Sequence, residues 1–217
     1  MHFEVLAEDR SGSIALECVL EKILGANGTD HTWRMHRYKG IGRIPRDLGR
    51  TPDPGKRLLL DQLPRLLRGY GRSLWRNAAC VIVVVDLDSR DCMAFKRELL
   101  DALEACNPQP RTLFRIAIEE SEAWLLGDRP ALVAAYPRAR KSVLDRYVQD
   151  SVCGTWEVLA DAVHAGGSAR LKKAGWPVPG KAKCDWAAAI APHMDVDRNQ
   201  SGSFQVFRDG IRRLAAG

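Results

Sequence analysis

The sequence lacks an apolar run long enough to span a lipid bilayer. A membrane helix needs roughly 18 or more consecutive apolar residues, whereas the longest run here covers only residues 78–85. The first residues, Met1-His2-Phe3-Glu4, contain neither a basic n-region nor an apolar h-region, so the signature of a secretory signal peptide is missing. We therefore expect a cytoplasmic protein that does not associate with a membrane.

Cysteine pairs at metal-binding spacing are absent as well. The six cysteines form no CxxC motif, and none lies near a histidine at zinc-finger spacing, so we do not expect a structural zinc site. The five histidines are scattered and suggest no catalytic triad. Most of the cysteines are typical of small core residues in a reducing compartment.

Neither sign of charge dominates the chain. Lysine and arginine number 33 against 27 aspartates and glutamates, which gives a net charge of +6. This mild basic excess is compatible with a polyanionic partner such as nucleic acid. With 217 residues, 46% of them hydrophobic, the chain is long enough for one α/β core, with or without a small appendage.

Alternating strand and helix patterns occupy the first part of the chain. Alternation or continuous apolar character predicts strands at residues 2–8, 32–38, 79–86 and 112–118. Helical spacing predicts helices at residues 14–24, 56–70 and 91–104, and a short one at 123–126. Ser11 or Ser13 is the expected N-cap of the first helix. This order predicts an α/β fold with a mostly parallel sheet and helices on both faces.

Strand signals fade after residue 137. Residues 154–165, 183–193 and 203–215 have helical patterns, and loops rich in glycine and proline separate them. We therefore predict an α/β core over residues 1–136 and, over residues 137–217, a helical extension that packs on that core.

Acidic residues end three of the predicted strands. Glu8 follows the first strand, Asp86 and Asp88 end the central one, and the segment 119–122 after the last strand contains three glutamates. Open α/β sheets place their active sites at the carboxyl ends of the strands, and hard cations such as Mg²⁺ prefer oxygen ligands. We expect Asp86 and Asp88 to point to the same side of an extended backbone. The alternative is that each acid merely ends a strand and faces solvent.

Two segments resemble a known domain. "AEDRSGSIALECVLEKIL" and "VVVDLDSRDC" are similar to the Toprim domain of topoisomerases, primases and the overcoming-lysogenization-defect (OLD) nucleases, with Asp9 standing where glycine is usual. Further segments, among them "HRYKGIGRIP", "RIAIEESEAWLLGD" and "KAKCDWAAAIAPHMDVDRNQSGSFQVFRDGIR", resemble a Toprim-related family of unknown function, number four-two-seven-six, from about residue 3 to residue 213.

The resemblance implies roles for individual residues. It makes Glu8 a general base or metal ligand and Asp86 with Asp88 the metal pair. The implied metal ligands for Mg²⁺ or Mn²⁺ are Glu8, Asp86, Asp88 and Glu122. The implied catalytic set also contains Glu120 and Lys183, whose cation would stabilise charge developing on a scissile phosphate. Lys39, Arg43 and Lys181 are the expected contacts to nucleic acid.

These residues together predict a Mg²⁺-dependent Toprim nuclease that hydrolyses phosphodiester bonds in DNA or RNA. OLD nucleases join a Toprim domain to an ABC-type ATPase, whereas this sequence has no GxxxxGK[ST] phosphate loop. We therefore expect a separate ABC-type ATPase as the partner of this chain in a phage-defence system. A homodimer of the chain is a further assembly that we consider. The alternative is a non-catalytic nucleic-acid-binding or regulatory Toprim subunit of an ATPase complex.

Overall fold

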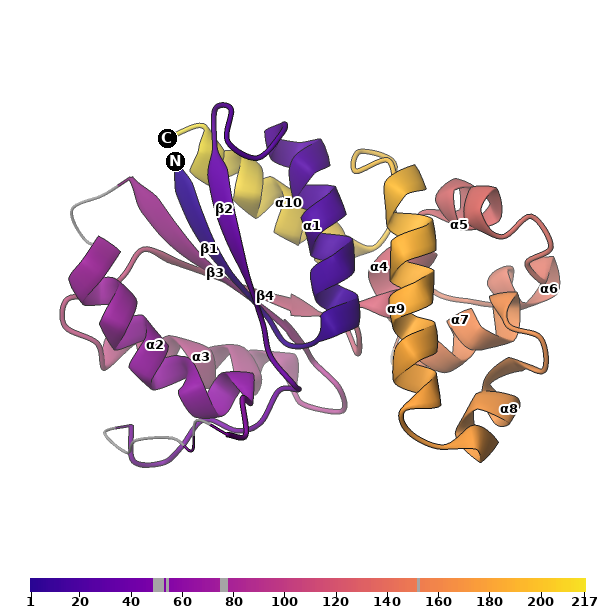
Figure 1. The fold of residues 1–217 in the computed structure, drawn as a ribbon, viewed down its shortest axis with the longest axis horizontal. Coiled ribbons are helices and arrows are strands. Elements are labelled where there is room, and N and C mark those ends of the chain that lie inside the picture. The colour runs from indigo at the N-terminus through magenta and orange to yellow at the C-terminus, as the bar shows by residue number, and fades with distance from the viewer. Residues whose placement is uncertain (49–52, 54, 75–77, 152) are drawn as a thin grey trace.

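Strand β3 (Ala79–Asp86) is buried along its whole length, as expected for an apolar strand covered on both faces. The structure is a computed structural model that describes residues 1–48, 53, 55–74, 78–151 and 153–217. β3 lies between β1 (His2–Ala7) and β4 (Thr112–Ala117), and β2 (Thr32–Arg37) pairs with the free side of β1. The order is thus β2-β1-β3-β4 with parallel pairings throughout (Figure 1), which confirms the predicted parallel sheet.

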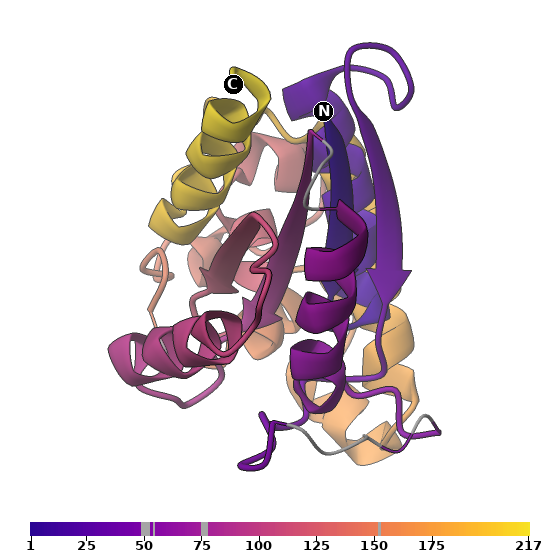
Figure 2. The ribbon, with the colours of Figure 1, turned by 90° about the vertical axis from the view of Figure 1, so that its left-hand side faces the viewer.

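Helices cover both faces of this sheet (Figure 2). Alternate strand residues such as Val5 and Ile82 pack against α1 (Arg10–Leu24) and α10 (Gly202–Ala215). Their neighbours, such as Leu6 and Val83, pack against α2 (Leu59–Leu74) and α3 (Cys92–Glu104). The two-residue period of the strands therefore divides the apolar side chains between two cores, and the predicted α/β class is confirmed.

The remaining helices form a group beside the sheet (Figure 1). They are α4 (Glu122–Leu126), α5 (Arg129–Ala135), α6 (Lys141–Leu144), α7 (Thr155–Val163), α8 (Gly167–Ala174), α9 (Val178–Ile190) and the 3₁₀ helix η1 (Ala191–His193). α9 packs along α1, and α10 returns to the sheet against β4. The short helices α5, α6 and α8 were not predicted, because few turns carry little periodic signal. The division of the chain near residue 137 stays a prediction.

The N-cap of α1 differs from the prediction. The Asp9 Oδ1 atom accepts a hydrogen bond from the Gly12 N–H at 2.7 Å, and the Ser11 hydroxyl donates to Asp9 Oδ2 at 2.7 Å. The cap is therefore Asp9 rather than Ser11 or Ser13, because an aspartate before the first helical residue can satisfy a free backbone N–H. As a result, α1 begins directly after Glu8 and Asp9.

Within the described part of the chain, none of the helices combines the length and the apolar character that crossing a membrane requires.

Candidate active site

The carboxyl ends of three strands bring acidic residues to one edge of the sheet. Glu8 follows β1, Asp86 ends β3, and Glu120 lies just after β4. The register sets Ala7 beside Val84 and Asp86 beside Ala117. Because the strands are parallel, their ends and the acids that follow them lie at the same edge.

Glu8 and Asp86 are linked through the backbone. The Asp86 N–H donates to Glu8 Oε2 at 3.0 Å, and the Ser121 N–H donates to Asp86 Oδ1 at 3.0 Å. These three residues and Asp9 line a small cavity of about 10 Å³, which is about the volume that one water molecule needs. Two carboxyl groups on neighbouring strands therefore face the same confined space.

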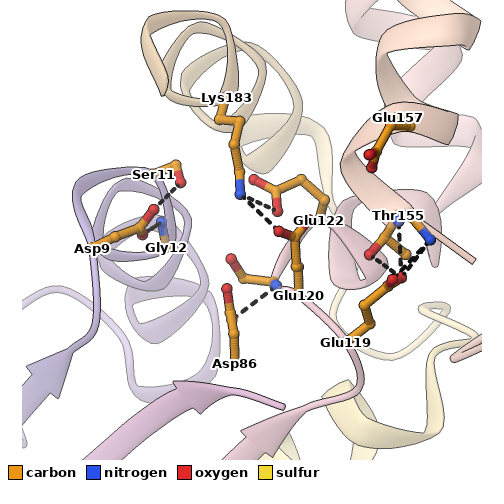
Figure 3. Close-up of polar contacts among 12 residues, drawn as sticks. Asp9, Ser11, Gly12, Asp86, Glu119, Glu120, Glu122, Thr155, Glu157 and Lys183 are labelled. Carbon is orange, nitrogen blue, oxygen red and sulfur yellow. Dashed lines mark hydrogen bonds and ion pairs between the residues drawn. The ribbon is translucent and has the colours of Figure 1, made fainter. Parts of the chain in front are cut away.

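Lys183 on α9 reaches into this group of acids (Figure 3). Its Nζ atom lies 3.1 Å from Glu122 Oε2 and 3.5 Å from Glu120 Oε1. The side chains are almost enclosed, with exposed fractions of 13% for Lys183, 19% for Glu120 and 2% for Glu122. A buried charge is costly unless it is paired, so Lys183 and the two glutamates depend on one another.

The acids have raised pKa values. Burial, with smaller contributions from the charges of Asp88 and Asp9, raises the pKa of Glu8 to about 7. Burial and the charge of Glu122 raise the pKa of Glu120 to about 7 as well. Carboxyl groups that sit together in a poorly hydrated place resist ionisation in this way.

Asp86 and Lys183 respond in opposite ways to the same surroundings. Burial and the neighbouring charges of Glu8 and Glu122 raise the pKa of Asp86 well above its usual range. For Lys183 burial acts to lower the pKa, but the charges of Glu122, Glu120 and Asp86 outweigh it and raise the pKa above the usual value. Lys183 therefore stays protonated, and its single charge does not balance the several carboxyl groups around it.

Asp88 does not share the orientation expected from the DxD pattern. β3 ends at Asp86, and Asp88 has a φ of 51° in a turn where its N–H donates to the Glu119 carbonyl at 2.8 Å. Its side chain is 46% exposed and lies 3.9 Å from Arg90. Asp88 lines a separate cavity of about 250 Å³ with Glu119, Glu120 and Glu157. The prediction failed because the backbone is no longer extended after Asp86.

Glu119 turns away from the other acids. Its carboxylate accepts hydrogen bonds from the Gly154 N–H at 2.8 Å, from the Thr155 N–H and hydroxyl at 2.9 Å each, and from the Cys153 N–H at 3.2 Å (Figure 3). Burial acts to raise its pKa, but these hydrogen bonds together lower it below the usual value. Glu119 therefore anchors the start of α7, where free backbone N–H groups need acceptors.

The donor set limits how a metal ion could bind. In residues 1–48, 53, 55–74, 78–151 and 153–217, no group of three or more His, Cys, Asp or Glu side chains is arranged to hold an ion. Glu8 and Asp86, however, place two carboxyl groups on one cavity. Glu120 Oε2 is buried, and no hydrogen-bond partner for it occurs among the described atoms. Mg²⁺ usually keeps several waters and takes one or two carboxylates, so Glu8 and Asp86 could supply two of its ligands, but the cavity of about 10 Å³ between them has room for only one water-sized group.

The model of a protein family described as "Domain of unknown function (DUF4276)" matches residues 7–212. This chain belongs to the DUF4276 family. The match confirms the family that the sequence resembled, and it contains every predicted site residue from Glu8 to Lys183. No curated protein and no solved structure matches the chain.

Two of the predicted nucleic-acid contacts of this DUF4276 chain lie in the loop after β2. Lys39 and Arg43 are exposed, and the Gly40 N–H donates to the Glu8 carbonyl at 3.0 Å, so the loop begins beside the acids. Gly42 has a φ of 69°, and a Cβ atom there would lie 2.6 Å from Asp61 Oδ1. Glycine at this position therefore lets the loop pack against α2 and present both cations.

Lys181 does not join the acid cluster of the DUF4276 chain. It is exposed on α9 and pairs with Asp185 at 2.8 Å. Residues two apart on a helix point in different directions, which is why Lys183 is enclosed and Lys181 is not.

The sequence analysis did not predict two residues that contribute to the site of this DUF4276 chain, Ser121 and Asp9. Ser121 acts through its backbone N–H, for which a side-chain motif gives no signal. Asp9 contributes negative charge next to Glu8, and its position ahead of Ser11 and Gly12 is a typical N-cap pattern that could have identified it.

Proposed function

We propose that this DUF4276 protein is a Mg²⁺- or Mn²⁺-dependent nuclease of Toprim type that hydrolyses phosphodiester bonds. One observation carries the proposal: a buried, protonated Lys183 lies against Glu120 and Glu122 at the sheet edge where Glu8 and Asp86 share a cavity. A hard cation held by acids can activate water, and a lysine can neutralise charge on a phosphate oxygen, so both groups can contribute to phosphodiester hydrolysis.

Each residue has a defined task in the proposed reaction. A water oxygen attacks the phosphorus, the bond to the leaving sugar oxygen breaks, and the water proton passes to a carboxylate, for which Glu8 beside the cavity is the candidate. Lys183 neutralises charge that develops on the phosphate. The leaving oxygen takes its proton from solvent. A bound Mg²⁺, held by Glu8 and Asp86, would lower the pKa of the attacking water and offset negative charge.

The Toprim relationship supports the proposal through the residues quoted from the sequence, with Glu8, Asp86 and Asp88 at the matching positions. On the same resemblance to OLD nucleases we extend the proposal to an assembly with a separate ABC-type ATPase that acts in phage defence. Cleavage compared with and without such an ATPase and ATP tests this extension.

The decisive experiment is cleavage of plasmid DNA and tRNA by the purified chain in Mg²⁺, Mn²⁺ or EDTA. We expect metal-dependent cleavage that Asp86→Asn abolishes while nucleic-acid binding stays intact. The matched control is Asp101→Asn, which removes an exposed aspartate that pairs with Arg97 on α3 and should leave cleavage unchanged. Absence of cleavage by the wild-type chain with either metal, alone or with an ATPase partner, would rule out the nuclease.

Lys183 provides a second arm of this experiment. Lys183→Met should lower turnover with little loss of binding, since the interaction is made mainly in the transition state. The control, Lys181→Met, removes an exposed lysine from the same helix. Circular dichroism must show that both variants are folded at the assay temperature.

A different observation favours the non-catalytic alternative. Lys183 already acts as an internal counter-ion for Glu120 and Glu122, and no three-residue metal group occurs in the part of the chain that the structure describes. In a regulatory or nucleic-acid-binding subunit, this ion cluster would have a structural role. Salt-sensitive nucleic-acid binding without cleavage in any metal would support that alternative.

A further inference from the structure

A groove of about 560 Å³ lies between the end of β2, which is the edge strand next to β1, and the first half of α2. Three arginines from different segments line it: Arg37 ends β2, Arg57 precedes α2, and Arg65 lies on α2. All three are exposed. Arginines that converge from separate elements form a local patch of positive charge, unlike the basic run of a single solvated helix face.

The positive charge of the groove is not balanced by its own lining. No acidic residue occurs among the described residues that line it. The contacts of the guanidinium groups are to neutral acceptors: Arg57 donates to the Arg37 carbonyl at 3.1 Å and Arg65 to Gln62 Oε1 at 3.3 Å.

The lining residue Tyr38 and the nearby Glu4 show where the positive and negative charges lie around the groove. Burial raises the pKa of Tyr38, while the charges of Arg57 and Arg65 oppose that rise, so both guanidinium groups lie close to its phenol. Glu4, which contacts the lining residue His36, is buried and also pairs with His2. The guanidinium groups of Arg57 and Arg65, with neutral contacts, and the exposed Arg37 therefore suit an anionic ligand.

The groove is poorly suited to a peptide strand. An added β-strand needs the outward N–H and C=O groups of the edge strand. The Asn27 side chain already bonds both the N–H and the carbonyl of Trp33, at 3.0 Å each, and Arg57 bonds the carbonyl of Arg37. Because these bonds occupy groups at both ends of the β2 edge, an added strand could pair only with the few groups between them, and an anion is the better match.

The chain that leaves the groove lining is bonded through its backbone to the end of β1, which carries the first acid of the candidate active site. The Tyr38 N–H donates to the Ala7 carbonyl at 3.1 Å, and the Gly40 N–H donates to the Glu8 carbonyl at 3.0 Å. The backbone just after β2, which begins at the lining residue Tyr38, therefore lies beside the backbone of Glu8. A ligand with repeated phosphates can occupy both places at once, whereas a single phosphate can occupy only one.

We infer that the Arg37–Arg57–Arg65 groove binds the phosphate backbone of a nucleic-acid strand next to the phosphate that lies at the acids. The inference rests on the proposed nuclease function, because it extends the path of the substrate from Glu8 to the edge strand β2. The substrate of the proposed nuclease would then be a linear polyanion, and the guanidinium groups of the groove would form bidentate hydrogen bonds to its phosphates.

The test is the affinity of a fluorescein-labelled single-stranded oligonucleotide, measured by fluorescence anisotropy in EDTA at several salt concentrations. The groove variant is Arg57→Gln with Arg65→Gln. The matched control is Arg138→Gln with Arg146→Gln, which removes the same charge from two exposed arginines elsewhere. We expect the groove variant to bind roughly tenfold more weakly, with a salt slope lower by about 0.7 for each lost phosphate contact. The control should bind like the wild type.

The outcomes separate this inference from the nuclease proposal, because binding in EDTA requires no cleavage. Binding that depends on the groove in a chain that cuts nothing would support the inference and refute the nuclease. Equal weakening by both variant pairs, or cleavage with binding that ignores the groove, would overturn the inference alone. Adenosine monophosphate is the competitor that identifies the ligand: displacement of the oligonucleotide at similar concentration would overturn a strand in favour of a free nucleotide.

Discussion

Lys183 Nζ lies 3.1 Å from Glu122 Oε2, although the two residues belong to helices α9 and α4, which are far apart in the chain. Glu122 is nearly inaccessible, and Lys183 also faces Glu120. Lys183 is thus the cation around which the acids of the sheet edge are arranged. Its removal would leave buried carboxylates without a counter-charge, and the first prediction follows from that imbalance.

Lys183→Met should destabilise the fold. Breaking a buried ion pair by removing one partner typically costs about 3–5 kcal/mol, because the other charge is left unpaired. The raised pKa values of Glu8 and Glu120, about 7 each, allow these two acids to take up protons and reduce that cost, so we expect a loss of about 2–3 kcal/mol at neutral pH. Urea unfolding measures it. Lys181→Met is the control and should unfold like the wild type, and an equal effect of both substitutions would contradict the prediction.

Stability in EDTA should fall as pH rises toward neutrality. The folded pKa of Glu8 and of Glu120 is about 7, against 4.5 for an ordinary glutamate. Between these pH values the folded protein binds more protons than the unfolded chain, so stability is highest at the acidic end of the window and is lost as pH rises through the folded pKa.

Glu8→Gln tests this dependence directly. The variant should have a shallower fall between about pH 5 and pH 7.5 and should gain about 1 kcal/mol or more over the wild type at the upper end. Glu98→Gln, at an exposed position on α3, should keep the wild-type profile. Chemical unfolding across this pH range gives the answer, and a wild-type profile that is flat or rising would refute the prediction.

Divalent metal should stabilise the folded chain through Glu8 and Asp86. An ion that binds only the folded state at a hundred times its Kd adds about 2.7 kcal/mol by mass action, which raises the Tm by several degrees. Asp86→Asn should abolish the rise in Mg²⁺ or Mn²⁺, and Asp101→Asn should preserve it. Differential scanning fluorimetry with each metal and with EDTA measures the effect, and an equal rise in the Asp86 variant would show that the ion binds elsewhere.

The adjacent glutamates Glu119 and Glu120 should differ in how their removal changes the stability of the fold. Glu119→Gln loses part of the acceptor set for Gly154, Thr155 and Cys153 and should cost about 1 kcal/mol at neutral pH. Because hydrogen bonds lower the pKa of Glu119, this contribution is present above pH 4.5 and fades as pH falls through its folded pKa.

Glu120→Gln should instead leave stability unchanged or higher at pH 7.5, since the buried charge of Glu120 is already disfavoured. Urea titrations of the two variants, side by side at neutral and mildly acidic pH, compare them. Two losses of the same size would mean that Glu120, like Glu119, is held by its hydrogen bonds.

The strands and the acids at their ends could be predicted because both are local patterns. The apolar residues 79–85 indicate a buried strand by themselves, and Asp86 ends it. The same local reasoning failed at Asp88, because it assumed an extended backbone, whereas the chain turns there with a φ of 51°. It also grouped Glu119 with the other acids, since no pattern shows that its neighbours across the fold are the N–H groups of α7.

The sequence by itself determined the class of the fold, the alternation of strands and helices along the chain with the parallel direction of the strands, and the carboxyl end of the sheet as the place where the acids gather. These follow from the spacing of apolar residues, which acts over a few positions of the chain. Only the tertiary structure decided that Lys183 is enclosed by Glu120 and Glu122, that Glu119 anchors α7, and that Arg37, Arg57 and Arg65 share one groove. The physical reason is that these contacts join distant segments: α9 reaches the acids because it packs along α1, and no periodicity within α9 specifies that neighbour.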